Sequence, residues 1–418
     1  MNFPLKNTNH YTINLKIAPQ EQFLDARVAL ALHAPANGIS HAEFFLHNQL
    51  VVAKVMGQKL AGYRFDQDSP SSIPYLPECG VITLEFSEPL EKGERIELEF
   101  EYRGKITKWP EWSANIISDE WTELGLYFPW FPYHPDDGDL TFSLDVECDP
   151  VYRMCSYGEC VRHGDTWHTE WDQPTNDIVI ALGKKLDKQS IQEENRVVRV
   201  NSVTLSQSTA NMMLKDVSSI LTCYAKWFSD QVPSQVSIIQ SPREKGGGYT
   251  RRGLIVLGGL HDQQFVERRE AYSRYLGHEI AHLWWWKAET TSWEDWLNES
   301  LAEYSALMIV REFFGQDSFD KRLADKQKTI EDTVPIWGFN RTDYSTKEKM
   351  KETEIILYNK GPVLLYELET RIGQKRFRAV CRQLISQNIA STHSFLQVLR
   401  GWEGDQVGDW MEKSLKTR

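Results

Sequence analysis

A His-Glu-x-x-His string that begins at His278 constrains this 418-residue chain more than any other feature. Residues four apart lie on one face of an α-helix, about one turn apart, so His278 and His282 can bind the same tetrahedral zinc ion. Glu279 then projects beside the metal, where a water molecule would be activated. Residues 265–287 contain no proline and a single glycine. We therefore expect one helix there.

A third protein ligand is needed, because catalytic zinc sites usually combine three protein ligands with a water molecule. Glu299, in the sequence Trp-Leu-Asn-Glu-Ser, lies on what we predict to be the next helix, after a break at 289–292. Glu303 follows one turn later, where its carboxylate either accepts a hydrogen bond from a ligand histidine or remains a solvated charge. The sequence thus predicts a site for one zinc ion made of His278, His282 and Glu299.

These two motifs, His-Glu-Ile-Ala-His and Trp-Leu-Asn-Glu, resemble the gluzincin aminopeptidases, the family of aminopeptidase N and leukotriene hydrolase. In that family eighteen residues separate the second histidine from the ligand glutamate, whereas sixteen separate His282 from Glu299. The loop between the two helices is therefore expected to be shorter and differently built. The resemblance implies a zinc-dependent peptidase in which Glu279 acts as the general base.

A further family motif, Tyr-x-Lys-Gly, matches the four residues that begin at Tyr358. By resemblance, the Tyr358 hydroxyl stabilises the negative charge that develops on the carbonyl oxygen in the transition state. A tyrosine before a helix can also serve packing alone, but the Lys-Gly that follows favours the catalytic interpretation. Only sixty residues follow Tyr358, so the resemblance is to a form without the large carboxy-terminal helical domain of full-length members.

The family's substrate strand, Gly-x-Met-Glu-Asn, is replaced here by Gly247-Gly248-Tyr249-Thr250-Arg251. The glycines Gly247 and Gly248 still let the backbone lie close to an extended substrate. Thr250 stands where the family has the glutamate that grips the free amino group of the substrate. The resemblance therefore predicts weakened recognition of that amine. Arg251 and the arginine after it either meet a substrate carboxylate or are solvated charges on an edge strand.

Glu123 and Glu244 are the nearest candidates to replace the missing glutamate. Without such a replacement, we expect poor activity on ordinary aminoacyl substrates. Two alternatives to an aminopeptidase-like enzyme stay open: a specialised zinc hydrolase that acts on a non-peptide amide or a metabolite, and a non-catalytic binding module. Retention of the ligands, of Glu279 and of Tyr358 argues against the module, whereas Thr250 keeps the specialised hydrolase open.

The chain is too long for one typical domain, and its pattern changes near residue 204. Residues 1–203 contain short apolar or alternating runs between turn clusters, which predicts an all-β sandwich or saddle-like domain. Residues 204–418 show helical periodicity after two short strands, and resemble the mostly helical, thermolysin-like zinc catalytic domain. The predicted fold class is therefore α+β with two domains, and the resemblance implies an active-site cleft between them.

The predicted elements can be placed by residue number. We expect strands at 10–17, 27–32, 42–46, 81–86, 95–102, 140–147, 167–171, 177–182, 196–201, 236–240 and 253–257, with turns at 67–72 and 91–93. We expect further helices at 208–228, capped by Ser208, and at 319–331, 353–372, 374–386 and 395–402.

The formal net charge of −12 argues against nucleic acid or an anionic membrane as the main partner. The resemblance implies a peptide or small amide as the substrate. The first residues lack the layout of a signal peptide, and no apolar run approaches the roughly 18 residues that span a bilayer. The six cysteines are scattered, which favours free thiols, although Cys155 and Cys160 could form a bridge within a hairpin. We expect a cytoplasmic protein.

Overall fold

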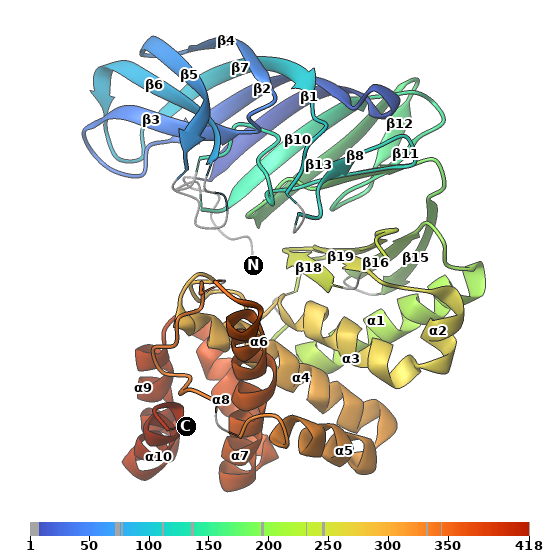
Figure 1. Cartoon of the computed structure of the whole chain (residues 1–418), viewed down its shortest axis with the longest axis vertical. Helices are drawn as coiled ribbons and strands as arrows, with labels where there is room; N and C mark the ends of the chain where they lie inside the picture. Colours follow the sequence, from blue (N-terminus) through green and yellow to red (C-terminus); the bar gives the residue numbers. More distant parts are fainter. Residues whose placement is uncertain are drawn as a thin grey trace. The chain divides into compact units, whose positions relative to one another are not determined.

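The computed structural model of this chain describes residues 8–71, 76, 78–110, 113–134, 138–193, 196–230, 232–244, 247–331, 333–343 and 345–417. The chain forms two compact units. The first consists of Met1–Thr204, Pro233–Gly246 and Arg251–Gly259, and the second consists of Leu205–Val232, Gly247–Thr250 and Leu260–Arg418. The first unit is built from strands and the second mostly from helices, which confirms the predicted fold class (Figure 1).

A seven-stranded sheet forms the centre of the first unit. Its order is β12 (Val161–His163), β13 (Thr166–Thr175), β10 (Leu140–Glu147), β1 (Asn9–Ala18), β2 (Phe23–His33), β7 (Arg95–Lys105) and β4 (Val51–Gly57). Along β1, Tyr11, Ile13, Leu15 and Ile17 are buried and the residues between them are mostly exposed. Successive side chains of a strand point to opposite faces, so this alternation places one face of β1 in the core.

Three smaller sheets accompany the large one. They have the orders β3 (Ile39–Leu46), β6 (Glu78–Leu90), β5 (Leu60–Pro70); β11 (Arg153–Cys155), β14 (Ile180–Gly183), β9 (Trp121–Leu124), β8 (Ile116–Ile117); and β15 (Asp187–Glu193), β16 (Arg196–Ser202), β17 (Gln235–Gln240), β19 (Leu254–Gly258), β18 (Gly247–Arg251). The six cysteines are free thiols, as expected, and no bridge joins Cys155 to Cys160.

The predicted strands fall on observed strands, but the sequence missed β4, β5, β8, β9, β11, β12 and β15. The run 177–182 becomes a strand only at Ile180. The turn predicted at 67–72 is wrong for residues up to 70, since β5 runs through them. Residue 72 lies outside the described residues.

The helices of the second unit are arranged around α4. They are α1 (Gln207–Trp227), α2 (Asp262–Glu267), α3 (Arg269–Ala281), α4 (Trp296–Phe314), α5 (Gln316–Gln327), α6 (Lys347–Ile355), α7 (Gly361–Ile372), α8 (Gln374–Ser386), α9 (Thr392–Glu403) and α10 (Asp405–Leu415). Nearly every residue of α4 up to Val310 is buried, and the buried residues include the polar Asn298, Ser300, Glu303 and Ser305. It contacts α3, α5 and α7 (Figure 1).

Several helix boundaries differ from the prediction. The expected helix 265–287 is divided into α2 and α3 and ends at Ala281. The cap of α1 is Ser206, whose side chain accepts the N–H of Thr209, and not Ser208. The expected helix 353–372 is interrupted by η3 (Ile356–Lys360), a π-helical turn. The helix predicted at 319–331 is α5, which ends at Gln327, and α10 was not predicted. Among the described helices, none is long and apolar enough to cross a lipid bilayer.

Candidate metal centre

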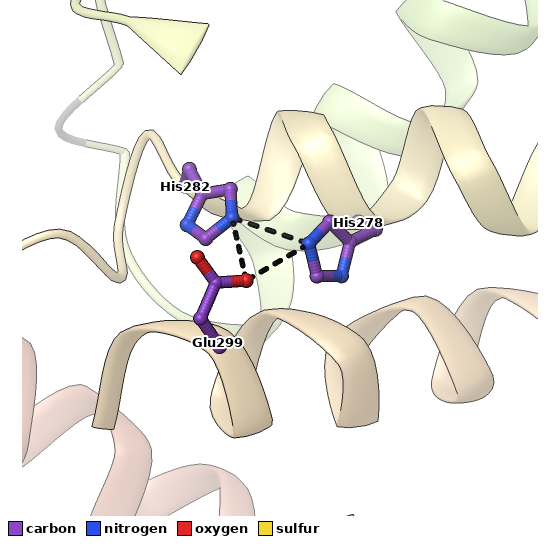
Figure 2. Close-up of side chains that lie close together, drawn as sticks. All are labelled: His278, His282 and Glu299. Carbon is purple, nitrogen blue, oxygen red and sulfur yellow. Dashed lines mark hydrogen bonds and ion pairs between the residues drawn. The ribbon is translucent and has the colours of Figure 1, made fainter. Parts of the chain in front are cut away.

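Three predicted ligands come together where the end of α3 meets the start of α4 (Figure 2). The Nε2 atoms of His278 and His282 lie 3.3 Å apart. The Oε2 atom of Glu299 lies 3.3 Å from Nε2 of His278 and 3.6 Å from Nε2 of His282. His278 lies in the last turn of α3, His282 ends that helix, and Glu299 lies in the first turn of α4.

The three residues fit a zinc ion. Ligand atoms that each lie 2.0–2.1 Å from one ion in a tetrahedral arrangement are about 3.3 Å apart, which is close to the separations seen here. Oε2 of Glu299 is buried and has no hydrogen-bond partner among the described residues, so a cation is needed there. Although burial acts to raise the pKa of Glu299, His282 and His278 hold it well below its usual range. The carboxylate is therefore ionised, as a metal ligand must be.

The neighbours of the two histidines direct both Nε2 atoms toward Glu299. Nδ1 of His278 lies 3.1 Å from Oε2 of Glu303, and Nδ1 of His282 lies 2.9 Å from the carbonyl oxygen of Trp285. Each acceptor holds the Nδ1–H tautomer, which leaves the lone pair of Nε2 available for a metal. Of the two alternatives for Glu303, the structure supports the hydrogen bond to a ligand histidine.

Glu303 is itself held by two cations. Nη1 of Arg274 donates to both of its oxygens at 2.8 and 2.7 Å, and Nζ of Lys326 lies 2.6 Å from Oε1. Although burial opposes them, Lys326 and Arg274 hold the pKa of Glu303 well below its usual range. Sequence reasoning missed both cations. Arg274 precedes His278 by four residues on the same helix, and this spacing was the available signal, whereas no local pattern indicates Lys326.

The chain after His282 does not continue the helix, because the indole groups of Trp284 and Trp285 form hydrogen bonds to residues of other segments. Nε1 of Trp284 donates to the carbonyl oxygen of Ser229, and Nε1 of Trp285 donates to Oγ of Ser305, each at 3.1 Å. The side chain of Asn298 then accepts the N–H of Ala288 at 3.1 Å and donates to its carbonyl oxygen at 3.0 Å.

This amide links the middle of the short loop to the first turn of α4. With sixteen residues between His282 and Glu299, the loop still brings Glu299 to both histidines.

Glu279 lies beside the three ligands and is buried. Its burial raises its pKa, and the nearby His278 and His282 act against that shift. A Cβ atom at Gly248 would lie 2.8 Å from Oε1 of Glu279 and 2.9 Å from the hydroxyl of Tyr275. A glycine is therefore needed where β18 passes the carboxylate.

Tyr358 lies in η3, with its ring 5.6 Å from the ring of His278. Burial, with a contribution from the Glu299 carboxylate, raises the pKa of Tyr358 well above its usual value. The hydroxyl therefore keeps its proton and can donate a hydrogen bond. Lys326 binds the carbonyl oxygen of Tyr358 at 2.7 Å, and Ser300 donates to the carbonyl oxygen of Leu357 at 2.7 Å, so the backbone of this turn is held from both sides.

A cavity of about 540 Å³ opens beside the metal centre. It is lined by Gly247 and Gly248 of β18, by His278, Glu279 and Tyr358, and by the cations Arg274, Arg322 and Lys326, among others. The cavity thus brings the two predicted substrate-strand glycines together with the candidate catalytic groups.

Both arginines at the end of the substrate strand form ion pairs within the protein. Nε of Arg251 donates to the fully buried carboxylate of Asp177 at 2.8 Å, and Arg252 pairs with Asp139 at 2.8 Å. Arg251 is thus not a solvated charge, because a buried carboxylate binds its Nε. Its contact with a substrate carboxylate stays a prediction.

The candidate replacements for the amine-binding glutamate lie in the first unit. Glu123 is buried and accepts the indole N–H of Trp121 at 3.0 Å, whereas Glu244 is exposed. Their proposed role in binding a substrate amine stays a prediction.

Comparisons with known proteins agree with this geometry. Residues 250–413 match the model of the peptidase family M1 domain. Aminopeptidase Q of Mus musculus is 23% identical over 352 residues, which are 73% of this chain and 62% of that protein. Leucyl aminopeptidase of Saccharolobus solfataricus is 28% identical over 316 residues, 67% of this chain and 39% of that protein. The chain therefore spans less than two thirds of the length of either relative.

Solved structures share the fold over nearly the whole chain. The M1 zinc metallopeptidase of Deinococcus radiodurans matches with a TM-score of 0.75 at 17% identity, over 98% of this chain and 94% of that one. A mutant of the Deinococcus radiodurans M1 zinc metallopeptidase, bound to a Tyr-Ser-Ala substrate, matches over 99% of this chain and 94% of that chain, with a TM-score of 0.74 at 17% identity. Leukotriene A4 hydrolase of Saccharomyces cerevisiae matches with a TM-score of 0.72 at 15% identity, over 98% of this chain and 68% of that one. The resemblance inferred from the motifs is confirmed.

Proposed function

We propose that this chain, whose residues 250–413 match the peptidase family M1 domain, is a zinc-dependent peptidase of the aminopeptidase type. The observation that carries the proposal is the arrangement of His278, His282 and Glu299, whose ligand atoms lie 3.3 to 3.6 Å apart with Glu279 beside them. Its relatives named aminopeptidases support a peptide as the substrate. The expected location in the cytoplasm remains part of this proposal.

The chain's own residues would move the protons of the reaction. Zinc, when bound, supplies a Lewis acid and lowers the pKa of a bound water molecule to about 7. The carboxylate of Glu279 takes the proton of the attacking water and delivers it to the leaving amine, a transfer that typically contributes about 10²–10⁴ in rate. Burial raises the pKa of Glu279, which suits a group that must first accept a proton and then release it.

Tyr358 would stabilise the developing oxyanion. Its hydroxyl keeps its proton and lines the same cavity as Glu279, so it can donate to the carbonyl oxygen as negative charge accumulates there. Glu303 and the carbonyl oxygen of Trp285 hold the two histidines in the orientation that the ligand set requires.

The proposal includes weakened dependence on the free amino group of the substrate. Thr250 carries no charge, and its hydroxyl is within hydrogen-bond distance of Glu279. A lost hydrogen bond to a charged group costs about 1.5–3 kcal/mol. The same observation favours a second candidate, a zinc hydrolase specialised for a non-peptide amide, which would turn over no member of a peptide panel.

Two experiments test the proposal. Glu279→Gln should abolish peptide hydrolysis while the protein still binds one zinc ion, because Glu279 is not a ligand; an unchanged rate would contradict the role of general base. The second experiment compares one peptide with its amino-acetylated form. Strong loss of activity on acetylation would mean that another carboxylate recognises the amine and that Thr250 has not weakened this recognition.

A further inference from the structure

The cavity beside the metal centre is lined by three basic side chains from two helices. Arg274 comes from α3, and Arg322 and Lys326 come from α5, one turn apart. Glu279 and Tyr358 line the same cavity, so a group bound near the three cations belongs to the molecule whose amide is at the reacting centre. The hydrogen-bond donors that these cations offer in the cavity therefore affect the substrate preference of the enzyme.

Lys326 binds other residues of the cavity wall through its ammonium group. Its Nζ atom lies 2.6 Å from Oε1 of Glu303, 2.7 Å from the carbonyl oxygen of Tyr358 and 3.3 Å from Oδ1 of Asn359. These three contacts use the three donors of an ammonium group. Glu303 is thereby neutralised, since Arg274 and His278 also bind it.

The two arginines retain N–H donors that their ion pairs do not use. In the part of the chain that the structure describes, the bonds of Arg274 use Nη1 and those of Arg322 use Nε, which lies 2.6 Å from Glu270. A guanidinium group has five N–H donors, so several remain on each side chain. The side chains of Arg274 and Arg322 are 31% and 28% exposed, which leaves these donors accessible from the cavity.

The acidic groups around the cavity offset the formal charge of its three cations, so an anion would bind to the unused guanidinium N–H donors and not to a net positive charge. Glu279 and Glu303 are buried, and Asp325, which is exposed, pairs with Lys328 at 2.9 Å. A planar guanidinium matches a carboxylate, which it can bind through two parallel hydrogen bonds. A carboxylate therefore matches the donors that Arg274 and Arg322 leave unused.

We propose that this enzyme prefers substrates that carry a carboxylate, which binds to Arg322 and Arg274 in the cavity beside the reacting centre. The inference rests on the proposed peptidase function and names its substrate class. It assigns to these two arginines the carboxylate recognition that the sequence had suggested for Arg251. The carboxylate belongs either to an acidic side chain or to the free carboxy terminus of a short peptide.

Four matched peptides test the proposal and distinguish these two sources. They carry Glu or Gln beside the scissile bond, each with a free or an amidated carboxy terminus. With the wild-type protein, kcat/KM should be roughly tenfold higher for the Glu peptides if the side chain binds, or for the free termini if the terminus binds. Equal kcat/KM for all four peptides would overturn the inference and leave the peptidase function intact, whereas turnover of none would contradict the peptidase function itself.

Two variants locate the preference. Arg322→Gln should bring the ratio between the preferred peptide and its neutral partner close to one. Glu270→Gln removes the same ion pair but keeps the guanidinium, so it should preserve the ratio. A preference that survives in Arg322→Gln, or one that disappears in Glu270→Gln, would contradict binding to Arg322.

A binding measurement gives a readout that is independent of turnover. In the Glu279→Gln background, calorimetry with the same four peptides should show the same roughly tenfold difference in Kd. Equal Kd values there would also overturn the proposal.

Discussion

The hydroxyl of Thr250 lies 2.8 Å from the carbonyl oxygen of Glu279 and 3.1 Å from Oε2 of its carboxylate. Thr250 occupies the position at which the family's substrate strand carries the glutamate that grips the amine. In this chain the Thr250 hydroxyl contacts Glu279, the proposed general base. Threonine is uncharged, so the proposed loss of a counter-charge for the substrate amine would be accompanied by a hydrogen-bond donor beside Glu279.

Thr250→Val should lower kcat about tenfold, since valine keeps the shape of threonine but cannot donate a hydrogen bond to the carboxylate. KM for a neutral peptide should change little if the hydroxyl acts on Glu279. Thr250→Ser restores the donor and should recover most of the rate. Steady-state kinetics on one peptide, with zinc content measured for each variant, checks this prediction. A Thr250→Ser protein as slow as Thr250→Val would show that the methyl group matters and not the hydroxyl.

Tyr358→Phe should reduce kcat by about 10²–10³ with little change in KM, because an oxyanion donor acts mainly in the transition state. The ring itself is retained, so its contact with His278 and its packing should persist. Thermal unfolding of the variant provides the control for folding. If the variant hydrolysed peptides at the full rate, the charge on the carbonyl oxygen would have to be stabilised by another group.

Glu303→Gln should weaken zinc binding about 10- to 100-fold, the usual effect of altering the hydrogen-bond partner of a ligand histidine. The change also leaves Arg274 and Lys326 without their shared carboxylate, so thermal stability should fall. Competition with a chelator of known affinity gives the zinc dissociation constant.

Glu312→Gln is the matched control, because Glu312 lies on the same helix and is exposed. Equal zinc affinity in the two variants would mean that Glu303 does not support the metal centre.

The metal centre was predictable because its geometry is local. Two histidines four residues apart on a helix, and a glutamate at the start of the next, bring their ligand atoms together with little help from the rest of the chain. The end of that helix was not predictable. It depends on the indole groups of Trp284 and Trp285, which bind Ser229 and Ser305 far along the chain.

The same distinction explains the errors in the substrate strand. Arg251 reads as a free cation in the sequence because its partner, Asp177, lies 74 residues away. Two of the three cations that line the cavity, Arg322 and Lys326, come from α5, which has no motif of its own. The strands β5 and β15 were missed because their residues are largely exposed and lack the apolar alternation that marks a half-buried strand.

His47 in the first unit makes the stability of this protein depend on pH. Its Nε2 lies 3.1 Å from the carbonyl oxygen of Lys108, its Nδ1 accepts the N–H of Gln49, and its ring stacks on Phe128. Burial lowers the pKa of His47 from 6.5 to about 4, and the hydrogen bond to Lys108 acts against this shift. The folded protein therefore holds the neutral ring well below the pH at which the unfolded chain binds a proton.

As the pH falls from 6.5 toward 4, the unfolded state takes up a proton that the folded state refuses, so the free energy of unfolding decreases. The contribution of His47 to this loss should reach about 3 kcal/mol by pH 4 and should be absent above pH 7. His47→Gln keeps a donor for the carbonyl oxygen of Lys108 but does not titrate. Denaturant unfolding gives the free energy of unfolding of both proteins at each pH, and the contributions of the titrating groups that they share cancel in the difference. The stability advantage of the wild-type protein over His47→Gln should shrink as the pH falls. Parallel curves would mean that His47 is protonated as readily in the folded state as in the unfolded chain.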